Sequence, residues 1–255
     1  MLSIQLLFLF NYVVLIKAEC EYSPHTVCET TTTPISNYFA YLTMSWPGTY
    51  CLDNCCHAIS EINEGFTIHG YWPQRGANEY QYCCTTDWKT DEITNYVNNN
   101  AYLRDALRYY WPGLKRCSFF NYEYLKHGTC LPTLTNGENG PLYYADIALG
   151  IANKTNAWSE LKKKGVVDNG ITAYKTETIR EYFHDIYGVY PLLFCNENGY
   201  MDEDRLCTQI PTFPMRANAT LYDCPESFRA EVETCGETII FSPFPTYDIN
   251  DICPY

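Results

Sequence analysis

Long apolar runs are missing from this sequence after its first 18 residues. The stretch from Leu2 to Ile16 is apolar and nearly uncharged, but it is shorter than the roughly 20 residues that a membrane-spanning helix needs. Ala18 supplies the small residue expected at a cleavage site, so residues 1–18 are predicted to be a secretory signal peptide. We therefore expect an exported chain without membrane insertion.

Positive charge is scarce. The chain has 17 Lys and Arg residues against 30 Asp and Glu residues, and its formal net charge of −13 becomes −14 if Lys17 leaves with the signal peptide. Such a chain repels polyanions at neutral pH and low salt, which disfavours a high-affinity nucleic-acid-binding module. The basic cluster at residues 162–164 is expected to be a solvated helix end. An acidic compartment would weaken the repulsion, because it protonates carboxylates and charges histidines.

Paired CxxC motifs, typical of structural zinc sites, are also missing, although cysteine is abundant. All 14 cysteines follow the apolar N-terminal run, and an even number in an exported chain predicts disulfides rather than free thiols. The spacing of Cys51, Cys55 and Cys56 does not fit a four-ligand zinc site. We expect no metal ion and no other cofactor.

Internal repeats and low-complexity linkers are absent, apart from a short threonine run at residues 30–34. The length of residues 19–255 fits a single domain whose terminal segments are tied by disulfides. Asn153 and Asn218 each begin an Asn-x-Thr sequon, which makes them candidate glycosylation sites in an exported chain.

Hydrophobic periodicity predicts strands mixed with helices. Residues 38–45 and 66–69 alternate like strands, and in the second the apolar residues point inward while His69 projects from the opposite face. Helical spacing marks residues 91–111, 141–152 and 176–187. Pro112 and Gly188 would stop the first and the last of these helices. Because regular strand–helix–strand alternation is missing, the mixture predicts an α+β fold.

A carboxylate, an ammonium and an imidazole occur together in residues 122–130. If this segment is helical, Glu123, Lys126 and His127 share one face, because residues three and four apart are neighbours on a helix. Together they can take a proton, give one, and stabilise charge on a phosphoryl group. Gly128 would end the helix. Taken alone, the pattern better fits a solvated helix face with a Glu–Lys pair, and it is the second segment, upstream at residues 65–74, that favours a catalytic role.

Two segments together resemble the active-site motifs of the ribonuclease T2 family of secreted acid endoribonucleases. FTIHGYWP, at residues 66–73, is similar to the family's FTIHGLWP, and YEYLKHGTC, at residues 122–130, is similar to HEWxKHGTC. Further likeness at residues 45–51 and 186–191 extends the resemblance over nearly the whole mature chain. It implies a fold in which helices flank an antiparallel sheet.

The resemblance also implies cleavage of single-stranded RNA without a metal ion. In this scheme His127 is the general base that activates the 2′-hydroxyl, and His69 is the general acid that protonates the departing 5′-oxygen. The products are a 2′,3′-cyclic phosphate and then a 3′-phosphate. Glu123 and Lys126 match the family's transition-state stabilisers. DNA lacks the 2′-hydroxyl and should survive.

Four further residues match substrate-binding positions of the family. Trp72 matches a base-stacking aromatic, although a tryptophan here could instead anchor a turn in the core. Gln74 falls where relatives contact the base, and Phe119 where they contact the downstream base. Tyr122 replaces a histidine thought to help bind phosphate, and its phenol can donate a hydrogen bond but carries no positive charge.

The resemblance further implies a set of disulfides: Cys51–Cys55, Cys56–Cys117, Cys195–Cys235, Cys207–Cys224, and Cys130 with Cys83 or Cys84. Cys20, Cys28, Cys253 and the remaining member of the Cys83–Cys84 pair stay unassigned, because spacing alone does not determine connectivity.

Two rival functions remain. One is a secreted binding or signalling effector of the same fold with secondary or lost ribonuclease activity. The other is a disulfide-rich structural or inhibitor protein, which would have no reason to keep both motifs. The retained catalytic set favours an active, acid-optimal enzyme, secreted or held in a lysosome or another acidic lumen.

Overall fold

The computed structural model describes residues 27–53, 56, 63–115, 118–131, 135, 137–154, 156–211 and 219–245. The expected signal peptide at residues 1–18 and the sequon residue Asn218 lie outside the described residues. Within the described part of the chain, no helix is long and apolar enough to cross a membrane.

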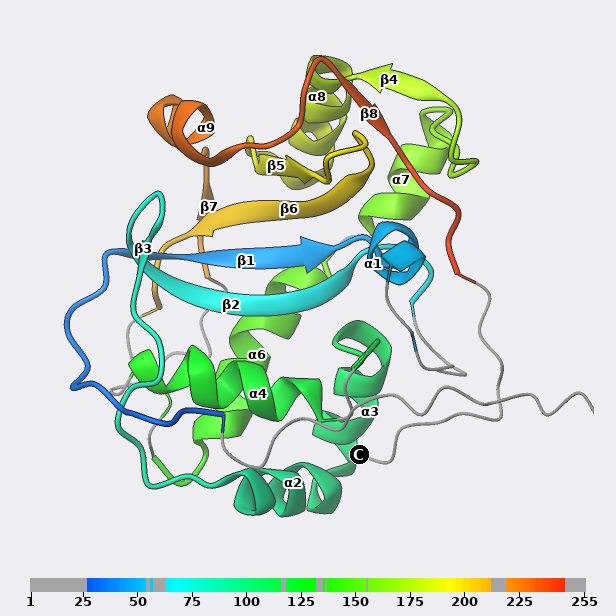
Figure 1. Cartoon of the computed structure of the whole chain (residues 1–255). Coiled ribbons are helices and arrows are strands. Elements are labelled where there is room, and N and C mark those ends of the chain that lie inside the picture. Colours follow the sequence, from blue (N-terminus) through cyan, green and yellow to red (C-terminus); the bar gives the residue numbers. More distant parts are fainter. Residues whose placement is uncertain are drawn as a thin grey trace, which may run out of the picture.

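A curved antiparallel sheet forms the centre of the molecule (Figure 1). Its strands run in the order β3-β2-β1-β6-β5, with β7 paired to β6. The strands are β1 (Phe39–Ser45), β2 (Thr67–Gly76), β3 (Glu79–Tyr80), β5 (Leu192–Cys195), β6 (Met201–Thr208) and β7 (Leu221–Tyr222). Every residue of β1 is buried, as expected for a strand with neighbours on both sides. The predicted strand at residues 38–45 is confirmed.

Helices lie on two sides of the sheet, so the predicted α+β class with flanking helices is confirmed (Figure 1). Four of them gather beside β2: α2 (Thr90–Asn99), α3 (Ala101–Tyr110), α4 (Phe119–Lys126) and α6 (Gly140–Ala152). Three more lie toward β5 and β6: α7 (Ala157–Lys163), α8 (Thr176–Tyr187) and α9 (Glu226–Val232). A two-stranded sheet of β4 (Ala173–Lys175) and β8 (Thr238–Ile240) accompanies them, and α1 (Pro47–Asp53) follows β1.

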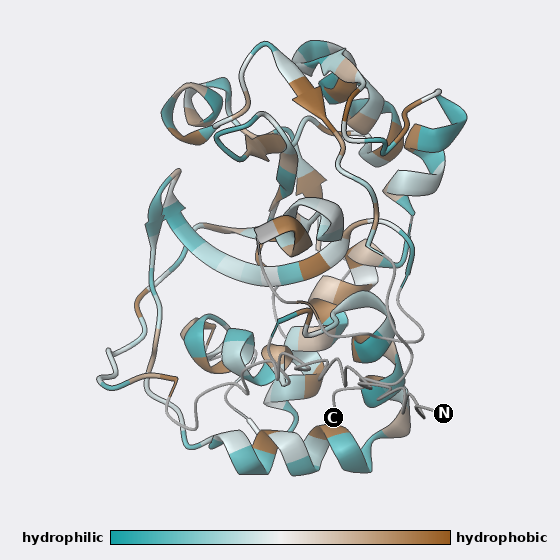
Figure 2. Ribbon diagram, turned by 45° about the vertical axis from the view of Figure 1, so that its right-hand side comes forward, coloured by the Kyte–Doolittle hydropathy of each residue, from teal (hydrophilic) through white to brown (hydrophobic). Residues whose placement is uncertain are grey.

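The main core is rich in aromatic rings. Trp46, at the end of β1, lies 4.5 Å from Trp158 of α7 between ring centroids, and it also contacts Phe66 and Phe241. Figure 2 shows hydrophobic residues alternating with hydrophilic ones along the helices and strands, and Trp46, Trp158 and Phe241 are fully buried. Aromatic pairs add about 0.5–1.5 kcal/mol beyond the area they bury. This core fixes the strands that carry the polar residues described below.

The predicted helix at residues 91–111 is wrong in one respect, because it is two helices. Asn100 separates α2 from α3 in an extended conformation (φ −112°, ψ 94°). Its side chain accepts a hydrogen bond from the Leu103 N–H at 3.1 Å and so caps α3. Asparagine is a favoured N-cap, and this local bond outweighs continuation of one helix. The helices predicted at residues 141–152 and 176–187 are confirmed, and Gly188 ends the latter with φ +75°.

Five disulfides lie among the described residues: Cys28–Cys83, Cys51–Cys56, Cys84–Cys130, Cys195–Cys235 and Cys207–Cys224. The last two pairings are confirmed, and Cys84 rather than Cys83 pairs with Cys130. The expected Cys51–Cys55 and Cys56–Cys117 pairings are wrong. Beyond the end of α1, the chain brings the Cα of Cys56 within 5.7 Å of that of Cys51, a span that a disulfide bridges. Cys55 and Cys117 lie outside the described residues.

Candidate active site

His69 projects from an irregularity in β2. The register between β1 and β2 shifts at this point, so that Thr43 faces Gly70 and the next residue, Met44, faces Ile68. Such bulges redirect side chains, and they are common beside active sites. The His69 side chain is 30% exposed while Phe66 and Ile68 are buried, as predicted, but Thr67, which the alternation put on the same face as His69, is only 2% exposed. Trp111 Nε1 donates to the His69 carbonyl at 2.9 Å and fixes the backbone.

Helix α4 brings a second imidazole to the same place. Glu123 lies between the two rings: its Oε1 is 3.9 Å from His69 Nε2, and its Oε2 is 3.9 Å from His127 Nε2. Trp72 Nε1 donates to Glu123 Oε2 at 2.8 Å. Burial raises the pKa of Glu123, although the His69 charge and the Trp72 hydrogen bond oppose it. A side chain at Gly70 would clash with Trp72 and Glu123, so only glycine leaves room for this arrangement.

Gly128 does not end α4 in the predicted way. The helix ends at Lys126, His127 caps it in a right-handed conformation, and Gly128 starts a 3₁₀ turn, η1 (Gly128–Cys130). A Cβ on Gly128 would lie 2.8 Å from Tyr124 Cδ2 and 3.0 Å from Tyr144 Cδ2. A glycine is therefore needed at this position because two buried tyrosines pack closely against it. A left-handed backbone conformation at the helix end is not the reason.

Lys126 and Tyr122, four residues apart on α4, are joined directly. Lys126 Nζ donates to the Tyr122 hydroxyl at 3.1 Å. The Tyr122 ring is nearly parallel to that of Phe119, with 13° between the planes and 6.3 Å between centroids. Tyr122 therefore restrains the ammonium of Lys126, a residue that lines the same cavity as both histidines, in addition to any contact it makes with a ligand.

The two imidazoles have opposite pKa shifts. Burial, followed by the charges of Lys126 and His69, lowers the pKa of His127 well below 6.5. Burial alone would also lower the pKa of His69. However, the charge and hydrogen bond of Glu203 and the charge of Glu123 outweigh it and raise that pKa above 6.5. At a pH between the pKa of His127 and the pKa of His69, His127 is neutral and His69 is protonated.

Glu203 of β6 is a partner of His69 to which no sequence motif pointed. Its Oε1 lies 2.5 Å from His69 Nδ1, and its Oε2 accepts a hydrogen bond from Arg205 Nη2 at 2.9 Å. Burial would raise the pKa of Glu203, but the charges and hydrogen bonds of His69 and Arg205 lower it to about 2. The carboxylate is therefore ionised wherever the protein is folded and working.

Two cavities meet at His69. The first has a volume of about 320 Å³, and its lining includes His127, Lys126, Trp72, Gln74 and Tyr80. The second has a volume of about 290 Å³, and its lining includes Phe119, Leu114 and Lys115. His69 and Tyr122 line both cavities, whereas His127 lines the first but not the second.

The first cavity holds two of the expected base-binding residues and one that was not expected. Trp72 is half-buried in its wall, with the Arg205 guanidinium 5.0 Å from the ring centroid. Gln74 is 2% exposed, and its Oε1 has no hydrogen-bond partner among the described residues. Tyr80 is 48% exposed, and its ring centroid lies 6.1 Å from that of His127. A turn-proximal tyrosine among 24 gives no distinctive sequence signal.

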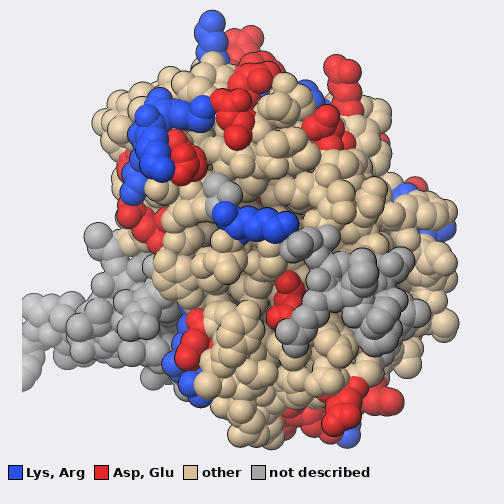
Figure 3. All heavy atoms as spheres, turned by 180° about the vertical axis from the view of Figure 1, so that it is seen from behind, with Lys and Arg blue, Asp and Glu red and all other residues tan. Residues whose placement is uncertain are grey.

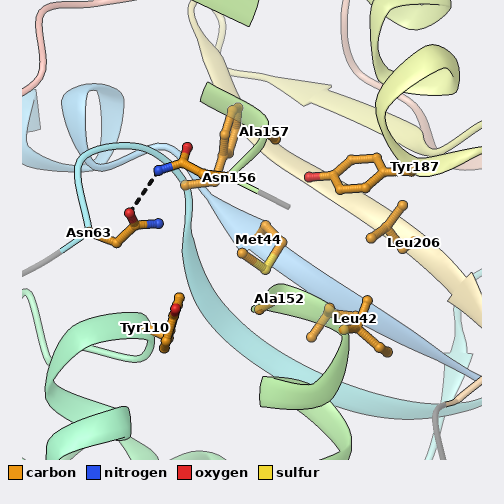
Figure 4. Close-up of a pocket in the computed structure, with 11 residues that line it drawn as sticks. Leu42, Met44, Asn63, Tyr110, Ala152, Asn156, Ala157, Tyr187 and Leu206 are labelled. Atoms are coloured by element: carbon orange, nitrogen blue, oxygen red, sulfur yellow. Dashed lines mark hydrogen bonds between the residues drawn. The ribbon is translucent and has the colours of Figure 1, made fainter. Parts of the chain in front are cut away.

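Other features are poor candidates for a site. The hollow in Figure 4 measures about 10 Å³ and holds at most one water. Its lining includes Leu42, Met44 and Leu206, and also Asn63 and Asn156, which are joined by a hydrogen bond of 2.8 Å. Within the described ranges, no group of three or more His, Cys, Asp or Glu residues is arranged to hold a metal ion.

Many of the basic groups on the surface are offset by acidic ones. On the face seen in Figure 3, Lys and Arg groups near the edges lie beside Asp and Glu groups, although a basic group near the middle stands apart from them. The predicted solvated helix end is confirmed, because its three lysines pair with exposed acids: Lys162 with Glu64, Lys163 with Glu160, and Lys164 with Asp185. Recognition of an anionic ligand therefore falls to the groups around His69.

Comparison with known proteins agrees with this geometry. Residues 36–224 match the Ribonuclease T2 family profile. The chain is 27% identical to intracellular ribonuclease LX of Solanum lycopersicum, over 84% of this chain and 87% of that protein. It is 28% identical to ribonuclease T2 of Sus scrofa, over 78% of this chain and 94% of that protein. An RNase-related protein from Calystegia sepium has the same fold, with TM-score 0.62 and 25% identity over 82% of this chain and 98% of that one.

Proposed function

This chain belongs to the ribonuclease T2 family, and on that premise we propose that it is an endoribonuclease that cleaves single-stranded RNA by transphosphorylation, without a metal ion. The observation that carries the proposal is the pair of imidazoles with opposite pKa shifts on either side of Glu123. A general base must be neutral and a general acid protonated before reaction, and His127 and His69 favour those states over the same pH range.

The reaction uses the nucleophile that RNA itself carries. Neutral His127 takes the 2′-hydroxyl proton while the 2′-oxygen attacks phosphorus. Protonated His69 gives its proton to the 5′-oxygen as the P–O5′ bond breaks, and the product ends in a 2′,3′-cyclic phosphate. In the slower second step the roles reverse: neutral His69 takes a proton from the water that attacks phosphorus, and protonated His127 gives a proton to the 2′-oxygen as the P–O2′ bond breaks, which leaves a 3′-phosphate. Lys126 stabilises the negative charge that develops on the phosphoryl oxygens.

The two cavities support one strand direction. The nucleotide that carries the attacking 2′-hydroxyl must lie beside His127, which lines the first cavity, so the upstream nucleotide occupies that cavity in this proposal. The leaving nucleotide must lie beside His69, and the second cavity, which His69 lines and His127 does not, is the one proposed for it. Trp72 and Tyr80 offer faces on which the upstream base stacks, and the unpaired Gln74 Oε1 can accept a hydrogen bond from it. Phe119 contacts the downstream base.

The route and working conditions form part of the same proposal. Residues 1–18 act as a signal peptide, and residues 19–255 form a single exported domain. Cleavage is fastest at mildly acidic pH, where the negative charge of the protein is reduced. Asn153 is exposed just after α6, where a glycan can attach, although its side-chain oxygen accepts a hydrogen bond from the Tyr110 hydroxyl at 2.6 Å.

The test is incubation of the purified protein with single-stranded RNA and EDTA over a range of pH, with analysis of the product ends. Oligonucleotides ending in cyclic phosphate are expected, DNA of the same sequence should stay intact, and His127→Ala should be nearly inactive. Cleavage that EDTA abolishes, or products with 5′-phosphate ends, would refute the mechanism. If the wild-type protein left RNA uncut, the result would instead favour the alternative function, a binding effector. The presence of Glu123, Lys126 and both imidazoles in one site argues against that alternative.

A further inference from the structure

Three neighbouring strands bring a carboxylate to the far side of the His69 ring. In the register of the sheet, Ser45 of β1 is opposite Thr67 of β2 on one side and opposite Glu203 of β6 on the other. Glu203 therefore reaches across β1 to His69, which lies two residues beyond Thr67. Its Oε1 contacts Nδ1 at 2.5 Å, and Ser45 Oγ lies 3.4 Å from both atoms.

The two nitrogens of His69 have different surroundings. Nδ1 is engaged by Glu203, while Nε2 lies 3.9 Å from Glu123 Oε1, which is beyond hydrogen-bond distance. A carboxylate that is ionised can only accept, so it fixes the Nδ1 proton in both charge states of the ring. The proton that His69 exchanges is then the one on Nε2, the nitrogen on the Glu123 side of the ring.

We propose that Glu203 is a positioning residue for the general acid: it holds the proton of His69 on Nδ1, so that the proton given to the leaving 5′-oxygen always comes from Nε2. This inference rests on the proposed function, in which His69 is the acid. Arg205 acts one step further out. Its guanidinium donates to Glu203 Oε2 at 2.9 Å and 3.3 Å, which keeps the carboxylate ionised and aimed at the ring.

Other charged groups near His69 shift its pKa in opposite directions. Glu123 of α4 stabilises the imidazolium, and Arg205 of β6 disfavours it. Burial, followed by the Glu203 charge, raises the pKa of Asp202 on β6 to about 6, and the His69 charge opposes this shift. Burial and the Lys126 charge lower the pKa of His127, and the His69 charge lowers it further. Among these groups, Glu203 makes the direct hydrogen bond to the ring, so its removal should have the largest effect on the His69 charge.

The test compares the wild type with Glu203→Gln, which keeps the shape of the side chain but removes its charge. Nuclear magnetic resonance titration follows the His69 ring, whose signal is identified by its loss in His69→Asn. We expect the wild-type pKa to lie above 6.5 with the neutral ring protonated on Nδ1, and to fall by about one unit or more in the variant. The alkaline limb of kcat/KM should move down by the same amount, with a loss of about tenfold above that limb and near-wild-type activity at acid pH.

Glu64→Gln is the matched control, because Glu64 is an exposed carboxylate that pairs with Lys162 at 2.9 Å on another part of the surface. It should change neither readout. An unmoved His69 pKa in Glu203→Gln, or an equal loss of kcat/KM at every pH, would overturn the inference. If that variant fails to fold, a wild-type His69 pKa at or below 6.5, or a neutral ring protonated on Nε2, overturns it equally. The titration needs no RNA, so a wild type that fails to cleave RNA overturns the proposed function alone.

Discussion

Replacement of Tyr122 by phenylalanine should slow RNA cleavage only modestly. The Tyr122 hydroxyl accepts a hydrogen bond from Lys126 Nζ at 3.1 Å, so the variant removes one acceptor from a charged donor. Hydrogen bonds to charged groups contribute about 1.5–3 kcal/mol. Because Lys126 is partly exposed, water replaces much of the lost bond. We therefore expect a loss of about 1 kcal/mol, which is a roughly fivefold fall in kcat/KM.

Two other substitutions give this value a scale. His127→Ala removes the general base and should cost about 10²- to 10⁴-fold. Tyr122→His, the residue in the family's motif, adds positive charge at acid pH, although the protonated ring no longer accepts a hydrogen bond from Lys126, so it should raise kcat/KM modestly below the imidazole pKa. Tyr102→Phe on α3 is a matched control, since that side chain is 68% exposed and lines neither cavity.

The assay is steady-state cleavage of a short single-stranded oligoribonucleotide at several pH values, with thermal unfolding measured on each variant. The ordering decides more than the magnitudes. If Tyr122→Phe were as damaging as His127→Ala, the phenol would have to be a primary catalytic group. The assignment of proton transfer to the two imidazoles would then be wrong.

Three further outcomes are expected. The profile of kcat/KM against pH should be bell-shaped, with an acid limb from His127 below pH 6.5 and an alkaline limb from His69 above it; full activity well above pH 8 would contradict this. Alkylation of the unreduced mature protein followed by mass measurement should label no cysteine, and several labelled thiols would disprove a complete disulfide framework. Burial raises the pKa of Asp204 well above its usual range. As pH rises above about 4, the carboxyl of the unfolded chain loses its proton while that of the folded protein keeps it, so the free energy of unfolding falls with rising pH. Asp204→Asn cannot ionise, so its melting temperature should fall less than that of the wild type between pH 4 and 7; parallel curves would count against this.

Local patterns predicted the parts of the site that lie close together in the chain. Glu123 and His127 are one helical turn apart, so spacing alone places them on a common face. Alternation around His69 correctly predicted that Phe66 and Ile68 are buried, although Thr67, predicted on the face of His69, is buried as well. Both features depend on backbone geometry over a few residues, and that geometry can be read from sequence.

Contacts between distant segments could not be predicted in this way. Glu203 is 134 residues from His69, and only the strand order β2-β1-β6 makes them neighbours. The interruption between α2 and α3 at Asn100 arises because the Asn100 side chain caps α3 instead of allowing one continuous helix. The spacing of apolar residues is the same in both cases, so it does not predict the interruption. The Cys51–Cys56 pairing depended on the residue at which α1 ends. Sequence patterns rarely predict the end of a helix to the exact residue.

The Cys84–Cys130 bridge has a consequence for survival among proteases. It closes a loop of the chain that contains α2, α3 and α4, and it joins the segment after His69 to the segment after His127. A peptide bond cut anywhere between α2 and α4 would leave two fragments, one with each imidazole, still covalently linked. A nicked molecule could therefore keep its two catalytic halves together, and reduction followed by denaturation would be needed to separate them.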